Sequence, residues 1–215
     1  MKRMIQSALI KALDELTEII DSNAARVKRL KDSLTEELPT EKTQLLRNGI
    51  VKYNNLSALT NKVCDIYLVL LDINTYGTYC MIADDEWEWR AFARHIYTIL
   101  YEHSTSVSKQ INDIIRIIKA DVIEGYDLTP LLTAKKDYSK FINDNSELFK
   151  QIRVKVDAHY DAEFSDRLSL IKDLSYCNVF NTYYTYTSKM QGFLHELKPV
   201  LDNLRLSADM AYNSI

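Results

Sequence analysis

The sequence predicts an all-α protein: an antiparallel bundle of about five or six long helices that forms a single domain over residues 1–215. Gly and Pro are scarce, with 4 and 3 residues, whereas an all-β chain of this length would need many more turn residues. Apolar residues recur at alternating spacings of three and four, which is the helical period. No repeat, low-complexity stretch or linker divides the chain, so long helices packed side by side are expected.

The first predicted helix runs from about Lys2 to Leu34. Its stripe at helical spacing consists of Ile5, Leu9, Ala12, Leu16, Ile19, Asn23, Val27, Leu30 and Leu34. Asn23 interrupts this stripe, and either a buried residue that sets the register or a solvent-facing position would explain it. A basic run follows, made of Arg26, Lys28, Arg29 and Lys31. Such a run could contact RNA or an acidic partner, but more often it is a solvated face.

The second predicted helix covers about Glu41 to Asp72, with Thr40 as its N-cap. Its stripe consists of Leu46, Ile50, Tyr53, Leu56, Leu59, Val63, Ile66 and Leu70. The next residues, Asn74–Gly77, include an Asn and a Gly and are expected to form a loop. Asp84 or Asp85 then caps a third helix over Glu86 to Glu124, and acidic residues in its first turn favour that start.

Three further helices are expected in the C-terminal half. A fourth starts near Pro130, a short fifth ends at Leu174, and the last spans about Cys177 to Ala211. Pro199 lies inside the last helix and is expected to kink or split it, because proline has no N–H to donate.

The composition narrows the class of protein. The net charge is -3, so the chain lacks the basic surplus of nonspecific nucleic-acid binders, and any such contact must be local. The cysteines, Cys64, Cys80 and Cys177, form no CxxC pair, which favours reduced thiols in the cytosol. No signal peptide or apolar stretch of membrane-spanning length is evident. We therefore expect a soluble cytoplasmic protein that does not bind a membrane.

No P-loop, nucleophile elbow or glycine-rich dinucleotide motif occurs, which argues against kinases, P-loop ATPases and Rossmann enzymes. His95 and His103 lie about 12 Å apart along the third helix, too far to share one metal ion. His103 falls on the apolar stripe and is expected to be a core histidine, while His195 is expected at the surface or at a seam. We expect no metal or other cofactor.

Aromatic residues gather near two helix starts. The group Tyr176, Tyr183, Tyr184 and Tyr186 could stack on bases, although helical spacing favours packing. Trp87 and Trp89 flank Glu88, so at least one of these indoles should be exposed, for example at a subunit contact.

One segment has a pattern that suggests chemistry. Arg153 precedes His159 by six positions, Lys155 lies between them, Ala158 comes directly before the histidine, and Asp161 follows it. This order resembles the R-x(4–6)-H motif of the HEPN superfamily of helical proteins, and it is most similar to the abortive-infection and toxin-like branch. The resemblance covers about ten residues, and the rest of the chain agrees with that family in being helical.

The resemblance implies a metal-independent ribonuclease site in the cleft of a homodimer. It makes His159 the general acid or base that acts on a ribose 2′-hydroxyl or on the leaving oxygen, and Arg153 the cation that stabilises the scissile phosphate. Lys155 would attract the RNA backbone, and Asp157 or Asp161 would bind substrate or orient the imidazole, unless either simply caps the next helix. On an unbroken helix, Arg153 and His159 point about 120° apart, so a break or a second subunit is needed.

Two hypotheses of different classes follow. The first is a HEPN-like RNA endonuclease of a toxin–antitoxin or phage-defence system that binds RNA as a homodimer. The alternative is a non-catalytic helical interaction or regulatory protein whose apolar stripes recruit a partner protein, such as a cognate antitoxin. A metal-dependent bundle enzyme has the least support, because the spacing of metal ligands is missing.

Overall fold

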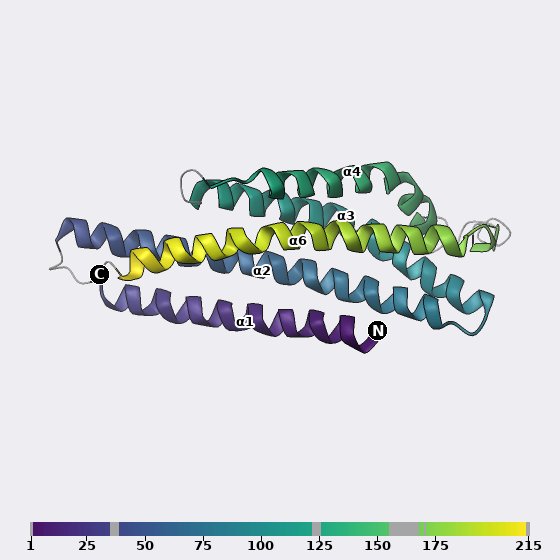
Figure 1. Ribbon diagram of the computed structural model, residues 1–215, viewed down its shortest axis with the longest axis horizontal. Helices are drawn as coiled ribbons and strands as arrows, with labels where there is room; N and C mark the ends of the chain where they lie inside the picture. The colour runs from purple at the N-terminus through teal and green to yellow at the C-terminus, as the bar shows by residue number, and fades with distance from the viewer. Residues whose placement is uncertain (1, 35–38, 122–125, 155–167, 170, 214–215) are drawn as a thin grey trace.

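The computed structural model describes residues 2–34, 39–121, 126–154, 168–169 and 171–213. These residues form five long helices and no strand (Figure 1). The helices are α1 (Lys2–Asp32), α2 (Thr40–Ile82), α3 (Glu86–Asp121), α4 (Thr129–Ile152) and α6 (Tyr176–Asn213). The predicted all-α bundle is therefore confirmed. Of the short fifth helix, 168–169 and 171–172 are helical, and its predicted start lies outside the described residues.

Helix α2 is the centre of the bundle. It packs against α1, α3 and α6, while α4 packs on the opposite side against α3 and α6. Figure 1 shows an elongated molecule in which α1 and α6 run in the same direction along α2 and end at the same tip. At the other tip α2 and α6 extend well past the N-terminus of α1. Among the described residues, no helix lies on the α1 side of this part of the α2–α6 seam.

The core has two parts. The larger cluster lies among α2, α3, α4 and α6 and includes Ile73, Tyr97, Phe149 and Met190, each at most 1% exposed. A smaller cluster joins α1, α2 and α6 near the chain's C-terminal end; it consists of Val27, Leu30, Leu46, Tyr53 and Ala208. Burial of each large apolar side chain contributes about 1.5–3 kcal/mol, so these clusters fix how the helices pack.

The loop predicted for Asn74–Gly77 is wrong. These residues lie inside α2, which continues without a break to Ile82. The Asn74 amide nitrogen donates to the Leu70 carbonyl at 2.7 Å, and the Thr78 hydroxyl donates to the Asn74 carbonyl at 2.7 Å. Both side chains thus bond to the preceding turn of the helix, and burial against α6 outweighs the weak helix propensity of Asn and Gly.

The structure also decides between the predicted N-cap residues of α2 and α3. Thr40 is not the N-cap of α2 but its first helical residue; Pro39 precedes it in an extended conformation, and the Thr43 hydroxyl donates to the Pro39 carbonyl at 3.2 Å. Asp85, and not Asp84, caps α3, because its carboxylate accepts the backbone N–H groups of Trp87 and Glu88, both at 2.8 Å. The acidic first turn predicted for α3 is confirmed.

The interruptions predicted in the long helices have different outcomes. Asn23 is only 2% exposed, so the buried alternative holds, and its Nδ2 has no hydrogen-bond partner within the described part of the chain. Pro199 does not split α6, which is one continuous helix from Tyr176 to Asn213. Leu197 and Val200 on either side of the proline are buried, and their packing offsets the lost backbone hydrogen bond.

Candidate functional site

Arg153 marks the C-terminal end of α4. Its backbone N–H donates to the carbonyls of Lys150 and Phe149, and the chain then adopts a π-type turn at Arg153 and Val154. The guanidinium points to α3, where Nη2 lies 3.3 Å from Oε1 of Glu102. Its Nε is buried without a hydrogen-bond partner in the described residues. Arg153 is therefore part of an α3–α4 contact, and a phosphate would have to compete with Glu102 for it.

The other residues of the predicted ribonuclease site are His159, Lys155, Asp157 and Asp161. All four lie outside the described residues. Whether they converge with Arg153 stays a prediction.

The remaining histidines in the described ranges are not grouped. His95 stacks on Tyr76 of α2, with ring centroids 5.0 Å apart and the planes at 25°. His103 is half-buried on α3. His195 is exposed on α6, which agrees with the predicted surface position, and its Nδ1 lies 3.2 Å from Oε1 of Glu196. Over the ranges with assigned structure, no set of three or more His, Cys, Asp or Glu side chains is arranged to hold a metal ion.

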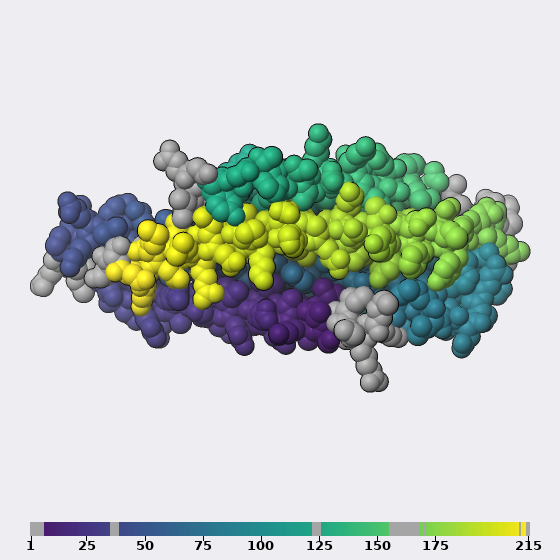
Figure 2. Space-filling view, viewed as in Figure 1, coloured from purple at the N-terminus to yellow at the C-terminus, as the bar shows by residue number. Residues whose placement is uncertain are grey.

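A groove lies between α1 and α6. Both helices pack on α2 but make few contacts with each other, and about 500 Å³ stays open between them. The floor is formed by Val63, Tyr67 and Leu70 of α2. The apolar walls are Leu9, Ala12, Leu16 and Ile19 of α1 and Leu194, Leu197 and Leu201 of α6. We call this the α1–α6 groove; both helices lie on the face seen in Figure 2.

The rim of the groove is charged. Glu15 lines it from α1, and His195, Lys198 and Asp202 line it from α6. Burial, together with the nearby Glu15 carboxylate, raises the pKa of Tyr67 above its usual value. The Tyr67 hydroxyl is therefore a neutral hydrogen-bonding group at pH 7, placed between an apolar floor and a polar rim.

Sequence reasoning missed this groove. Its apolar α1 residues Leu9, Ala12, Leu16 and Ile19 belong to the stripe predicted for the first helix. Periodicity thus identified the apolar face of α1 correctly. The distance that keeps α1 and α6 apart depends on how each packs against α2, and no local pattern encodes it. One feature of the sequence could have indicated the rim of the groove: three polar residues at spacings of three and four, His195, Lys198 and Asp202.

No protein-family model, curated protein or solved structure gives a significant match to this chain. The resemblance to the HEPN superfamily therefore depends on the segment from Arg153 to Asp161. Within the parts of the chain that the structure describes, no helix combines the length and the apolar character needed to cross a bilayer.

Proposed function

We propose that this chain is a non-catalytic interaction protein that binds an amphipathic helix of a partner protein in the α1–α6 groove. The observation that supports it is an elongated apolar opening of about 500 Å³ on a platform of three helices. Binding of an apolar helix face in such a groove is a common mode of recognition. A fourth helix placed there would pack against α1, α2 and α6 together, as in an ordinary bundle.

The length of the groove suits a short helix. Its lining residues run from Ala8 to Ile19 on α1 and from Gln191 to Asp202 on α6. At a rise of about 1.5 Å per residue, each wall is about 16 Å long, which corresponds to three turns of a partner helix. Three turns place apolar side chains at positions i, i+3 or i+4, and i+7 on one face.

The rim offers a partner charged contacts on both sides. A cationic side chain would meet Glu15 on the α1 side or Asp202 on the α6 side, and an anionic one would meet Lys198. Such exposed pairs contribute more to specificity and to the association rate than to affinity. Leu16 and Leu201, both half-buried, would lose their remaining exposure when a partner binds.

A designed probe tests this function. The probe is an amphipathic helical peptide of about three to four turns, with Leu on one face and separate rows of Lys and Glu beside it. We expect methyl NMR shifts at Leu16 and Leu201 on titration. Ala12→Trp, which fills the groove, should weaken binding about tenfold or more, whereas Ala25→Trp on the exposed opposite side of α1 should not.

Two results would overturn the proposal. One is an absence of shifts at the groove methyls up to millimolar peptide. The other is binding of a twelve-carbon fatty acid, and not of the peptide, at the same methyls, because the groove would then be a site for small amphiphiles.

A second candidate function is the HEPN-like ribonuclease acting as a homodimer. What supports it is the departure from regular helix at Arg153 and Val154, since π-type turns within helices are frequent at functional sites. A change in helix geometry at this point is one of the two conditions under which Arg153 and His159 can face the same phosphate. The experiment for this candidate is RNA cleavage by matched histidine variants, described below.

A further inference from the structure

The N-terminal half of α6 carries an exposed ladder of aromatic rings. Phe180 stacks on Tyr176 on one side and on Tyr184 on the other, with centroid distances of 6.3 and 6.4 Å and interplanar angles of 11° and 13°. Their exposed fractions are 44% for Tyr176, 38% for Phe180 and 63% for Tyr184. We call these three residues the aromatic patch. It is distinct from the α1–α6 groove, which uses α6 from Gln191 onward.

The patch lies at the tip where α2 and α6 extend past the N-terminus of α1. Beside it, Gly77 and Cys80 of α2 form a shallow depression with Tyr176 and Phe180. On α2, Gly77 lies seven residues after Leu70 and so falls on the same helix face as the groove residues Val63 and Leu70. Met81, four residues further on, continues this face and is 47% exposed. Figure 1 shows that the N-terminus of α1 does not reach this part of the seam. Exposed aromatic and Met side chains in one area are typical of interaction surfaces.

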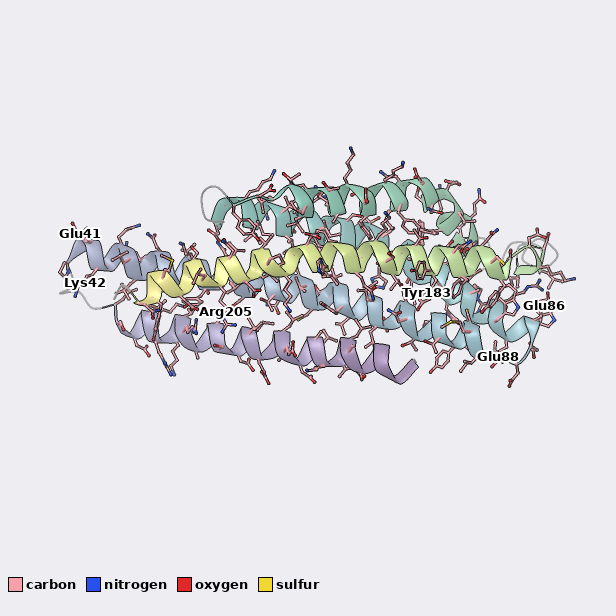
Figure 3. All side chains as sticks on the ribbon, viewed as in Figure 1. Glu41, Lys42, Glu86, Glu88, Tyr183 and Arg205 are labelled. Atoms are coloured by element: carbon pink, nitrogen blue, oxygen red, sulfur yellow. The ribbon has the colours of Figure 1, made fainter. Side chains whose placement is uncertain are left out.

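The charge next to the patch is negative. Trp89 lies edge-on to Tyr176, with centroids 5.7 Å apart, and so brings the first turn of α3 against the patch. That turn carries Glu86 and Glu88, which Figure 3 shows at this tip of the bundle. Glu88 and Asp85 accept hydrogen bonds from uncharged backbone amides, so these bonds bring no positive charge to either carboxylate.

One cation of α3 near the patch, Arg90, is held against the protein, whereas Lys172, one turn before Tyr176, is exposed. Arg90 is paired with Glu86 at 2.7 Å, and its side chain is only 11% exposed. Its guanidinium lies over the rings of Trp87 and Trp89, at 5.8 and 5.3 Å from their centroids. This tip therefore already binds one guanidinium by a carboxylate and aromatic faces. The exposed rings of the aromatic patch offer a guanidinium the same kind of aromatic face, and the α3 carboxylates lie one ring contact away, beyond Trp89.

We infer that the aromatic patch is a second docking surface, and that its occupant is an arginine-rich amphipathic helix of another protein. The apolar side of such a helix packs on Phe180 and Met81, and its guanidinium groups stack on Tyr176 and Tyr184 within reach of the α3 carboxylates. Electrostatics disfavours RNA here, because its phosphates would face Asp85 and Glu88, whereas Glu86 is paired with Arg90. This inference does not depend on the groove or on the ribonuclease hypothesis.

The test uses a fluorescein-labelled helical peptide with Leu on one face and Arg on the other, together with a matched peptide that has Glu in place of Arg. We expect the Arg peptide to bind and the Glu peptide not to bind, with affinity falling as salt rises. The double variant Phe180→Ser/Tyr184→Ser should weaken binding about tenfold or more. Leu206→Ser, an equally exposed apolar position at the opposite tip, should leave it unchanged.

Further arms separate the explanations. Glu88→Gln, which removes a carboxylate beside the patch but keeps an acceptor for the Asp84 backbone N–H, should weaken binding of the Arg peptide several-fold, whereas Ala12→Trp in the groove should have no effect. Circular dichroism checks that the double variant keeps its helicity; if it does not, Tyr184→Lys, at the most exposed ring, replaces it. The inference is overturned if the Glu peptide binds as well, if the patch variants bind normally, or if wild type fails to bind. It is also overturned if the variants abolish self-association or RNA binding instead.

Discussion

The ring of Tyr183 on α6 lies directly on Gly77 of α2. A β-carbon added to Gly77 would come within 2.5 Å of the ring's Cε2. Beside this contact, the Tyr183 hydroxyl donates to Oδ1 of Asn74 at 2.8 Å (Tyr183 is labelled in Figure 3). Asn74 and Gly77, which look like loop formers in the sequence, therefore form a close contact between the two helices.

Gly77→Ala should destabilise the protein by about 1–3 kcal/mol, because the new methyl group overpacks the Tyr183 ring. The helix propensity of Ala, about 1 kcal/mol better than that of Gly, offsets only part of this. Urea unfolding gives the free energy. Gly192→Ala is the matched control, since its added methyl meets nothing within 4 Å and should stabilise α6. Equal stabilisation by both substitutions would contradict the close contact.

Tyr183→Phe should cost about 1–3 kcal/mol, because Oδ1 of buried Asn74 loses its donor and keeps its desolvation penalty. Tyr184→Phe, at a ring that is 63% exposed, should be nearly neutral. Thermal unfolding of the two variants under the same conditions measures the difference. If Tyr183→Phe proves as harmless as Tyr184→Phe, the hydrogen bond contributes nothing to stability.

A partly buried network joins α1, α2 and α6 at the other tip. The Asp209 carboxylate accepts from the Tyr53 hydroxyl at 2.6 Å and from the Arg26 guanidinium, and Tyr53 is 0% exposed. Asp209→Asn should therefore destabilise the fold by about 1–3 kcal/mol. Asp202→Asn, on the exposed rim of the groove, is the control and should change stability little. Urea unfolding at pH 7 distinguishes the two variants.

The same network predicts a pH dependence. Burial, followed by the hydrogen bond to Asp209, raises the pKa of Tyr53 from 10.0 to about 12. Above pH 10 the unfolded chain releases this proton while the folded chain keeps it, so stability from Tyr53 is present below that pH and is lost as pH rises to about 12. Between these values, Tyr53→Phe should reduce the slope of unfolding free energy by up to about 1.4 kcal/mol per pH unit. An unchanged slope would contradict the assignment.

The ribonuclease hypothesis predicts cleavage of single-stranded RNA in the presence of EDTA. His159→Ala and Arg153→Ala should each abolish cleavage without unfolding the chain, and His195→Ala, an exposed histidine on α6, should cleave as wild type does. Glu102→Gln should strengthen RNA binding several-fold, because it frees the Arg153 guanidinium. Gel analysis of a labelled RNA is the measurement. Intact RNA with wild type, or cleavage by His159→Ala, removes this function.

Local patterns were enough to predict most of the fold. The apolar spacings placed α1, α3 and α6, and the start of α4, close to their observed bounds, since helical period is a property of neighbouring residues. The end of α2 was missed because Gly77 is explained only by Tyr183, more than a hundred positions later. Distance along the chain also hid the pairing of Arg153 with Glu102.

The candidate sites were harder to predict than the helices. The α1–α6 groove depends on the distance between two helices that both pack on α2. The aromatic patch depends on how far α2 and α6 extend past the N-terminus of α1. The spacing of apolar residues along one helix predicts neither of these quantities. The segment from Lys155 to Asp161 lies outside the described residues. The resemblance of this motif to the HEPN superfamily therefore stays a prediction from sequence.

The attachment of α1 has a mechanical consequence. Its C-terminal half is tied to both α2 and α6 through Arg26 and the cluster around Leu30, whereas Leu9 and Leu16 upstream border an open space instead of α6. The C-terminal half of α1 is thus held by both α2 and α6, whereas its N-terminal half packs on α2 alone. A small swing about the anchored end would change the width of the opening while leaving the rest of the core in place, so one scaffold can fit side chains of different bulk.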